Sequence, residues 1–214
     1  MDKFKKQREE LIDELKNQGI KDRNVLGAIL KIPRHLFVPK DLIKQSYENY
    51  PLEVGKSQTI SQPYTVAIML EALELKKNDK VLEIGTASGW NACLIAEIIK
   101  PGIVYTAEII PELVELAKEN IKKIKLKNIT VIHTDGSKGL SKYAPFDKII
   151  ITAGCPRIPD NLITQLKLNG IFVAPIGSLY SQDMLKIIKK KNGIEIKNLG
   201  KYIFVPLKGS GGWK

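Results

Sequence analysis

The sequence is poor in the residues that build metal centres and disulfide frameworks. Its 214 residues include two cysteines, Cys93 and Cys155, and two histidines, His35 and His133, with no CxxC pair. So few soft ligands at these spacings do not match a zinc site, and a disulfide is uncommon in a reducing compartment. We therefore expect neither a metal ion nor a disulfide.

Long apolar runs are also missing. No stretch approaches the ~20 residues that cross a bilayer, and the polar start MDKFKKQREE lacks the apolar centre of a signal peptide. Hydrophobic residues make up 43% of the chain and charged residues 27%, which is ordinary for a soluble globular protein. The sequence therefore predicts a cytoplasmic protein with no membrane partner, and its length favours one domain.

Arginine is scarce although the chain is basic. The net charge of +11 comes from 34 Lys and Arg against 23 Asp and Glu, and the arginines are Arg8, Arg23, Arg34 and Arg157. Arginine is the residue that clamps phosphates and reads bases through paired hydrogen bonds. An excess of positive charge made almost entirely of lysine therefore argues against a nucleic-acid partner.

The stretch VLEIGTASG, residues 81–89, is the most informative motif. A short apolar run leads into a loop with Gly85 and Gly89, and a helical pattern follows over residues 90–100. This order opens a nucleotide site in α/β sheets because small residues let backbone N–H groups approach a ligand. The loop lacks the middle glycine of a dinucleotide fingerprint, and no GxxxxGK[ST] sequence occurs, so phosphate-rich cofactors are disfavoured. S-adenosylmethionine, which carries no phosphate, fits better; a tight turn without a ligand is the alternative.

Strand-like and helix-like segments alternate regularly from residue 63 onwards. A helix begins at Pro63, with Ser61 or Gln62 as its cap. Strands are expected over 80–84, 103–109, 129–133, 148–152 and 171–176, and further helices over 90–100, 111–124 and 160–167. Strands separated by helices of this length imply crossover connections. We predict a doubly wound, mostly parallel, Rossmann-like α/β sheet.

The two ends of the chain have a different character. Amphipathic helices over residues 4–19 and 22–33, the second capped by Asp22, are expected to flank the sheet. Three strand-like segments near the C-terminus, 184–190, 194–199 and 202–207, predict antiparallel hairpins at the sheet edge. The single domain then divides into a helical, substrate-side extension (1–62), a cofactor-binding core (63–178) and a C-terminal hairpin and tail (179–214).

Acidic residues lie at or just beyond the ends of successive predicted strands. Glu108 ends the second strand about 20 residues beyond the glycine loop, where a carboxylate can accept hydrogen bonds from ribose hydroxyls. Asp135 and Gly136 follow the third strand and suit an adenine amino group, while Glu83 and the Gly85 backbone suit the methionine end of the cofactor. Structural alternatives stand beside each: a helix N-terminus for Glu108, a turn for Asp135-Gly136, and bonds to loop N–H groups for Glu83.

Six sequence blocks, in this order, resemble the protein-L-isoaspartate O-methyltransferase family: IPRHLFVP, GKSQTISQPYTVAIMLEAL, VLEIGTASGW, HTDGSKGL, FDKIIITAGCPRIPDNLITQLKLNGIFVAPIGS and FVPLKGSGGW. The resemblance runs from about residue 25 to residue 213. TISQP is its most specific part, because the glycine loop is common to class I methyltransferases. The resemblance implies an enzyme that uses S-adenosylmethionine to methylate the free α-carboxylate of L-isoaspartyl (or D-aspartyl) residues in damaged proteins and peptides.

The resemblance also implies roles for particular residues. Ser61 matches the active-site serine, whose hydroxyl donates to the substrate carboxylate; from the sequence alone, a helix N-cap is its alternative role. Substrate-binding positions match Thr59, Ile60, Val205 and Leu207, and cofactor-binding positions match Glu83, Gly85, Thr86, Gly89, Glu108, Asp135 and Gly136. The family usually has glycine at Ala87 and tyrosine or a smaller residue at Trp90, which leaves the exact loop shape open.

Methylation of a carboxylate fits a chain with so few acid–base residues. A carboxyl group with a pKa near ~3 to 4 is ionised at neutral pH, so the enzyme has mainly to position two reactants. Two other hypotheses are an RNA methyltransferase, motivated by the positive charge, and a cofactor-binding protein without catalysis. Against the first, residues 152–156 read TAGCP where an asparagine-proline-proline-tyrosine type of loop is expected. No pattern specifies an oligomeric state.

Overall fold

The computed structural model describes residues 3–213, and its centre is a seven-stranded sheet with the strand order β5-β4-β3-β6-β7-β8-β9. The strands are β3 (Lys80–Ile84), β4 (Ile103–Glu108), β5 (Ile129–His133), β6 (Phe146–Ile151), β7 (Leu166–Gly177), β8 (Gln182–Lys190) and β9 (Gly193–Tyr202). Pairing is parallel from β5 to β7 and antiparallel from β7 to β9. The predicted fold class is confirmed.

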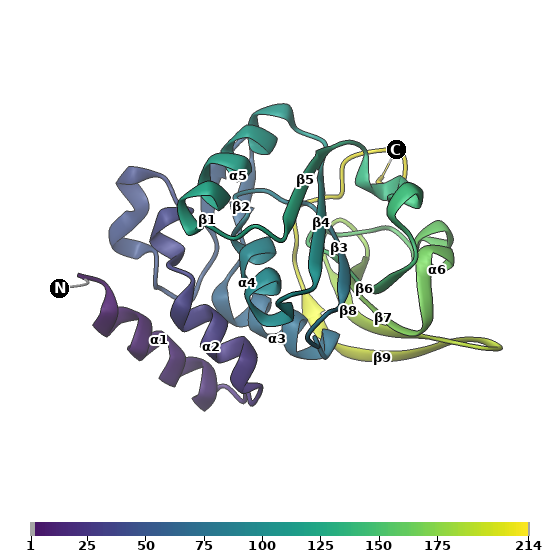
Figure 1. The fold of residues 1–214 in the computed structure, drawn as a ribbon, viewed down its shortest axis with the longest axis horizontal. Helices are drawn as coiled ribbons and strands as arrows, with labels where there is room; N and C mark the ends of the chain where they lie inside the picture. The colour runs from purple at the N-terminus through teal and green to yellow at the C-terminus, as the bar shows by residue number, and fades with distance from the viewer. Residues whose placement is uncertain (1–2, 214) are drawn as a thin grey trace.

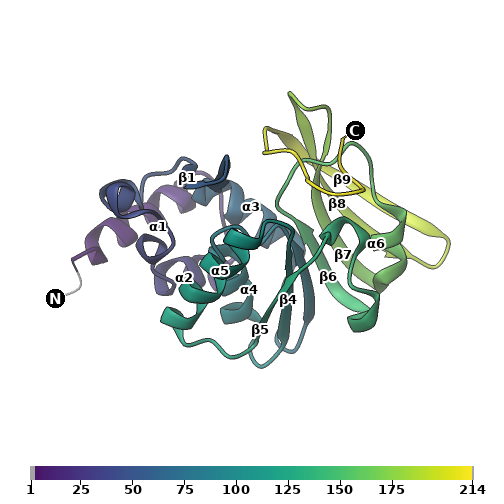
Figure 2. The same ribbon diagram turned by 90° about the horizontal axis from the view of Figure 1, so that it is seen from above.

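Helices cover both faces of this sheet (Figures 1 and 2). One face carries α3 (Pro63–Leu73), α4 (Trp90–Ile99) and α5 (Pro111–Ile124), and the other carries α6 (Asp160–Gln165). Strand residues alternate between two apolar clusters: Val81 and Ile150 pack with the first group of helices, whereas Leu82 and Ile149 pack with Leu162 of α6. Burial on both faces explains why these strands are nearly continuous apolar runs.

The N-terminal helices form an additional layer rather than covering the sheet directly. In the described chain, α2 (Arg23–Lys31) lies against α3 and α4, and α1 (Lys5–Asn17) lies against α2 and α3 (Figure 1). The expectation that they flank the sheet is therefore corrected, because α3 and α4 already occupy that face. Asp22 caps α2 as predicted, accepting hydrogen bonds from the N–H groups of Asn24 and Val25.

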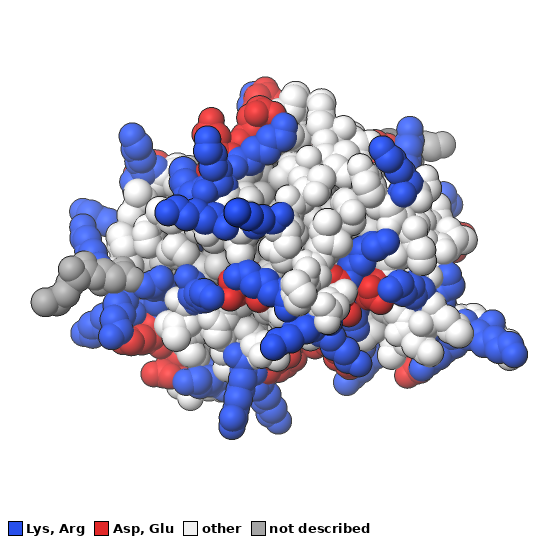
Figure 3. Space-filling model, in the orientation of Figure 1, with Lys and Arg blue, Asp and Glu red and all other residues white. Residues whose placement is uncertain are grey.

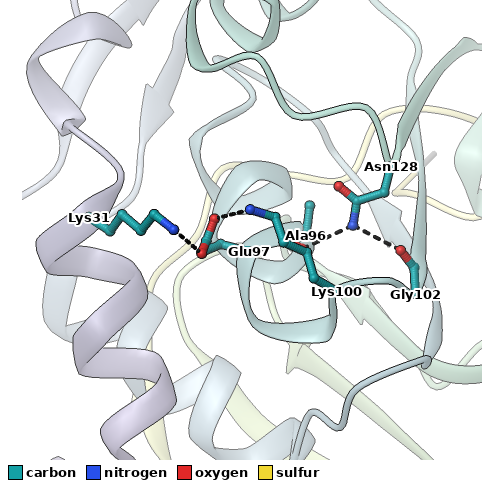
Figure 4. Close-up of polar contacts among 6 residues, drawn as sticks. All are labelled: Lys31, Ala96, Glu97, Lys100, Gly102 and Asn128. Atoms are coloured by element: carbon teal, nitrogen blue, oxygen red, sulfur yellow. Dashed lines mark hydrogen bonds and ion pairs between the residues drawn. The ribbon is translucent and has the colours of Figure 1, made fainter.

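Polar contacts fasten this outer layer to α4 (Figure 4). Lys31 at the end of α2 lies 2.6 Å from one oxygen of Glu97, and Lys100 lies 2.5 Å from the other. The side-chain amide of Asn128 donates to the carbonyls of Ala96 and Gly102 at 3.0 and 2.8 Å. These contacts fix the C-terminal end of α4 both to the N-terminal helices and to the segment before β5.

Two segments differ from the sequence-based expectation. A hairpin of β1 (Leu52–Gly55) and β2 (Gln58–Ile60) forms within the predicted helical extension, where no strand is expected. The strand expected over 202–207 is wrong: β9 continues to Tyr202, and Pro206 makes only an isolated bridge with Gly154. The partner strand β8 begins at Gln182, opposite Tyr202, and beyond this point the side chain of Gln182 accepts the N–H of Phe204 in place of a strand partner.

Shorter differences concern the element ends. Helix α6 stops at Gln165 because β7 begins at Leu166, and β6 covers 146–151 rather than 148–152. The short 3₁₀ helices are η1 (Arg34–Leu36), η2 (Lys40–Gln45), η3 (Gly136–Lys138) and η4 (Ser141–Tyr143). Within residues 3–213, no helix combines the length and the apolar character required to span a bilayer.

Candidate active site

A cavity opens at the carboxyl ends of β3, β4 and β6, where the glycine loop, β2 and the C-terminal segment meet. It encloses roughly 830 Å³, including its open mouth. The predicted residues in its lining are Thr59, Ile60, Ser61, Gly85, Thr86, Glu108, Gly136, Val205 and Leu207. Glu83, Gly89 and Asp135 are not part of this lining, although each is close to a residue that is. Segments far apart in sequence are thus brought to one place.

The glycine loop needs its glycines for both backbone and space. Gly85 has φ +96, and a Cβ atom there would lie 2.5 Å from Oγ1 of Thr152. That hydroxyl donates to the carbonyl of Gly85 at 2.6 Å, which closes the loop onto the end of β6. Gly89, with φ +86, precedes the first residue of α4. Ala87, where the family usually has glycine, also adopts a left-handed backbone with φ 45.

The carboxylate of Glu108 organises two loops at once. One oxygen accepts the N–H of Ala87 at 2.9 Å, and the other accepts the N–H groups of Ile109 and Ile110 at 2.9 and 3.0 Å. A carboxylate has about four acceptor sites, so three of these bonds leave room for a further donor from the cavity. Both sequence hypotheses, a ribose acceptor and a carboxylate near a helix N-terminus, are compatible with this arrangement.

Ser61 lies where two hollows meet. Ser61 lines both the cavity and a second, wider cleft. The walls of this cleft also include Pro51, Tyr64, Tyr202, Ile203 and Phe204. The N-cap of α3 is Gln62, and no side chain caps that helix. The N-cap hypothesis for Ser61 is therefore wrong, and no cap bond occupies its hydroxyl.

Residues 6–211 match the family described as Protein-L-isoaspartate(D-aspartate) O-methyltransferase (PCMT). The protein-L-isoaspartate O-methyltransferase of Dictyoglomus turgidum is 49% identical over 212 residues, covering 99% of this chain and 96% of the relative. That of Pyrococcus horikoshii is 50% identical over 206 residues, covering 95% and 93%. The chain belongs to this family.

Solved structures of the protein-L-isoaspartate O-methyltransferase family show the same fold. One superposes with a TM-score of 0.88 at 30% identity, covering 96% of this chain and 67% of that one. A putative member from Plasmodium falciparum, in complex with S-adenosyl-L-homocysteine, gives a TM-score of 0.83 at 28% identity, with 93% and 97% covered. The predicted family, enzyme class and methyl donor, S-adenosylmethionine, are confirmed.

Glu83 is more deeply placed than the sequence predicts for this methyltransferase loop. It is fully buried, and its oxygens accept hydrogen bonds from Nδ2 of Asn91 at 2.7 Å and Oγ1 of Thr106 at 2.5 Å. Oγ1 of Thr106 in turn lies 2.6 Å from Oγ1 of Thr86, which lines the cavity. Burial raises the pKa of Glu83 to about 7. The alternative of bonds to loop N–H groups is wrong, because its partners are side chains.

Asp135 anchors the C-terminal tail, whose contacts the sequence leaves unassigned. One oxygen accepts the N–H and hydroxyl of Ser137, and the other accepts the N–H and hydroxyl of Ser210, at 2.6 to 3.0 Å. Burial opposes ionisation, but these hydrogen bonds hold the pKa of Asp135 below its usual value. At Gly209 a Cβ would lie 2.1 Å from Asp135 Oδ1, so the close approach requires glycine. Gly136, beside Asp135, faces the cavity.

Arg34 is the functional residue that sequence reasoning missed. Its guanidinium is fully buried and donates to the carbonyls of Ser46 at 2.7 Å and of Tyr50 and Ser61 at 3.1 Å. It also lies 5.3 Å from the ring centre of Trp90, which lines the cavity. Burial lowers the pKa of Arg34 to about 10, so it remains charged at neutral pH. Its place within the IPRHLFVP block, in a chain poor in arginine, is the signal that could have found it.

The cysteines do not contribute reactive groups to the site. Cys93 and Cys155 are free and buried, and burial raises the pKa of Cys155 to about 12 and that of Cys93 further still. In the part of the chain that the structure describes, no group of three His, Cys, Asp or Glu side chains could hold a metal ion. The polar side chains that line the cavity are instead one carboxylate (Glu108), two carboxamides (Gln58 and Asn91), several hydroxyls and Lys208, and together with the backbone groups of the loop they suit an adenosine cofactor without phosphate.

Proposed function

We propose that this protein transfers the methyl group of S-adenosylmethionine to the free α-carboxylate of L-isoaspartyl residues in damaged proteins and peptides. The observation that carries the proposal is the single cavity that joins the glycine loop and Glu108 to Ser61 and the segment Val205–Leu207. A methyl donor and a carboxylate bound in these two halves would share one cavity. Family membership supports the same activity.

Each half of the cavity has its proposed contacts. For the cofactor, Glu108 accepts from the ribose, Gly136 borders the adenine with Asp135 behind it, and Gly85, Thr86 and Gly89 shape the loop at the methionine end. For the substrate, Ser61 donates its hydroxyl to the carboxylate, while Thr59, Ile60, Val205 and Leu207 form the walls. The lining in residues 59–61 and 205–207 supports this division.

The residues of this chain have to orient the reactants rather than move protons. When bound, S-adenosylmethionine supplies an electrophilic methyl group on a sulfonium ion. The substrate carboxylate is already ionised at neutral pH, so no residue has to act as its base. Ser61 and the backbone around it hold the carboxylate in line, which is a large contribution when the geometry is right. The apolar wall of Ile60, Val66 and Met69 limits access of water.

The wider cleft beside Ser61 is proposed to receive the peptide on either side of the isoaspartyl residue. It shares Thr59, Ser61, Thr152 and Val205 with the cavity, so an extended chain can pass from one to the other. Its remaining walls are mostly aromatic or neutral, and Lys201 is the only charged residue in its described lining. A neutral groove read largely through main-chain contacts tolerates many flanking sequences.

We also propose a cytoplasmic location and no nucleic-acid partner. Figure 3 shows Lys and Arg scattered over one face and mixed with Asp and Glu, without a single basic stripe. Nucleic-acid sites usually concentrate positive charge along one groove or face. A spread of lysines is instead typical of a solvated surface.

The activity is tested with labelled S-adenosylmethionine offered to three acceptors: an isoaspartyl peptide, its aspartyl isomer and bulk tRNA. We expect base-labile label on the isoaspartyl peptide alone, since a carboxyl methyl ester hydrolyses in base. Stable label on tRNA would instead support the RNA methyltransferase hypothesis. Absence of label on every acceptor, with the cofactor still bound, would support a binding protein without catalysis.

A further inference from the structure

One polar atom beside the cofactor half of the cavity has no partner. The residue is Asn91 in the first turn of α4, which belongs to the cavity lining. Its Nδ2 donates to Glu83 at 2.7 Å, but its Oδ1 is buried and accepts no hydrogen bond from any described residue. Leaving a buried acceptor unsatisfied is costly, and such exceptions call for a ligand or another explanation.

Glu83 determines which end of the Asn91 carboxamide is free. The other oxygen of Glu83 accepts a hydrogen bond from Thr106, and Glu83 is fully buried. The side chain of Glu83 is therefore held in place and does not turn toward the cavity. When Glu83 is ionised, above its pKa of about 7, rotating the carboxamide by half a turn would place Oδ1 against a carboxylate oxygen, and two acceptors repel each other. The ionised carboxylate of Glu83 thus holds the nitrogen of Asn91 inward and leaves Oδ1 as the atom without a partner.

The chemistry of the methyl donor identifies the matching group. The donor's methionine end carries one strong N–H donor, the α-ammonium, and one acceptor, the carboxylate, which a carboxamide oxygen would repel. Its ribose and adenine are proposed to bind toward Glu108 and Gly136, away from this turn. A carboxamide oxygen backed by a buried carboxylate is a stronger acceptor than one facing water, since hydrogen-bonded groups polarise one another.

We propose that Asn91 accepts a hydrogen bond from the α-ammonium group of the bound methyl donor, and that Glu83 acts behind it as a positioning residue rather than as a direct contact. The assignment rests on the cofactor part of the proposed function and not on the isoaspartyl substrate. It replaces the direct ammonium contact that the sequence suggests for Glu83.

The test measures binding without any methyl acceptor. Calorimetry compares S-adenosylhomocysteine, which retains the α-ammonium, with 5′-methylthioadenosine, which shares the adenosine and thioether but lacks the amino-acid portion. We expect Asn91→Ala to weaken S-adenosylhomocysteine about 10- to 100-fold, the range for a hydrogen bond to a charged group. Binding of 5′-methylthioadenosine should change less than about twofold.

A matched control is Asn120→Ala. Asn120 is a buried asparagine whose side chain donates to the carbonyl of Ser88 in the same loop at 3.0 Å, but it does not line the cavity. Its loss loosens the loop and should weaken both ligands by similar factors. Glu83→Gln should weaken S-adenosylhomocysteine selectively but less than Asn91→Ala. If the alanine variant does not fold, Asn91→Leu preserves the side-chain volume and is measured in the same way.

Several results would overturn the inference. Equal weakening of both ligands by Asn91→Ala would make Asn91 a loop support, like Asn120. If Asn91→Ala binds S-adenosylhomocysteine as tightly as the wild type, whereas Glu83→Gln binds it much more weakly and still binds 5′-methylthioadenosine normally, Glu83 would be the direct contact. A wild-type protein that binds neither ligand would overturn the cofactor assignment itself, whereas failure to methylate an isoaspartyl peptide with normal binding would overturn only the proposed substrate.

Discussion

The cofactor half of the cavity and the substrate half are held in place by opposite kinds of hydrogen bond. In the cofactor half, carboxylates accept from the backbone: Glu108 takes three N–H groups and Asp135 takes two. In the substrate half, one buried cation donates to the backbone, since Arg34 binds carbonyls that include that of Ser61. In the first half several carboxylates share the support, whereas in the second the carbonyl of Ser61 and the loop before β1 are tied together by one guanidinium.

Single substitutions should therefore affect the two halves of the cavity differently. Removing one carboxylate from the cofactor half leaves the others in place, and the loop keeps part of its support. Removing the guanidinium of Arg34 releases three carbonyls at the same time, two from the segment between η2 and β1 and one from the residue after β2. We therefore expect the substrate half to be the more fragile one.

Arg34→Met should have the largest effect. It removes the donor from the buried carbonyl of Ser46 and from the partly buried carbonyls of Tyr50 and Ser61, and we expect the free energy of unfolding to fall by about 2–4 kcal/mol. Denaturant unfolding measures this loss. Arg34→Lys is the control: it keeps the charge but cannot span all three carbonyls, so its loss should be intermediate. A methionine variant as stable as the wild type would show that Arg34 does not hold the substrate half together.

Gly85→Ala should have the next largest effect and acts on the cofactor half. The new Cβ would meet Thr152 Oγ1 at 2.5 Å, in a backbone conformation with φ +96. We expect binding of S-adenosylhomocysteine to weaken about 100-fold, measured by calorimetry. Gly19→Ala separates the two causes, because Gly19 has φ +101 but nothing within 4 Å. If Gly85→Ala binds as tightly as Gly19→Ala, the close approach to Thr152 does not matter for the cofactor.

The sequence predicts the cofactor half better because its signals are local. Strands β3 and β5 and the Asp22 cap come where their patterns place them, and Gly85 and Glu108 are found by their spacing along the chain. Each of these residues makes its contacts within, or next to, the strand and loop to which it belongs. For such units, periodicity and turn residues carry most of the information.

The substrate half escapes prediction for identifiable physical reasons. The turn between β1 and β2 has φ 55 at both Lys56 and Ser57, a conformation that Asn-Gly usually signals and that these residues do not. The C-terminal segment leaves the sheet because β8 begins opposite Tyr202, and the side chain of Gln182 then takes the N–H of Phe204. Arg34 acquires its partners only once η1, the segment before β1 and the end of β2 have come together. These are tertiary contacts, which no local pattern encodes.

Ser61→Ala should separate catalysis from stability within the substrate half. Because no cap bond uses the Ser61 hydroxyl, we expect turnover on an isoaspartyl peptide to fall about 10- to 100-fold while stability changes by less than about 0.5 kcal/mol. Cofactor affinity should stay nearly constant. Gln62→Ala makes the contrast, since the Gln62 amide donates to the carbonyl of Asn49 at 2.8 Å. Gln62→Ala should lower stability but not turnover. If instead Ser61→Ala lowered stability and Gln62→Ala lowered turnover, the role proposed for Ser61 would be contradicted.

Glu97→Gln should have the smallest effect and lies outside both halves. Burial opposes ionisation of Glu97, but the hydrogen bonds from Lys100 and Lys31 together outweigh it and hold the pKa of the Glu97 carboxyl below its usual value. A lowered pKa in the folded state stabilises the protein above the ordinary pKa, and this contribution disappears as the pH falls through the folded value. We expect the variant to lose about 0.5–1 kcal/mol at pH 7, with unchanged turnover, because the lysines are largely exposed. Melting curves at neutral and acidic pH should converge on acidification, and a stability difference that persists in acid would show that packing of Glu97, rather than its charge, fastens α2 to α4.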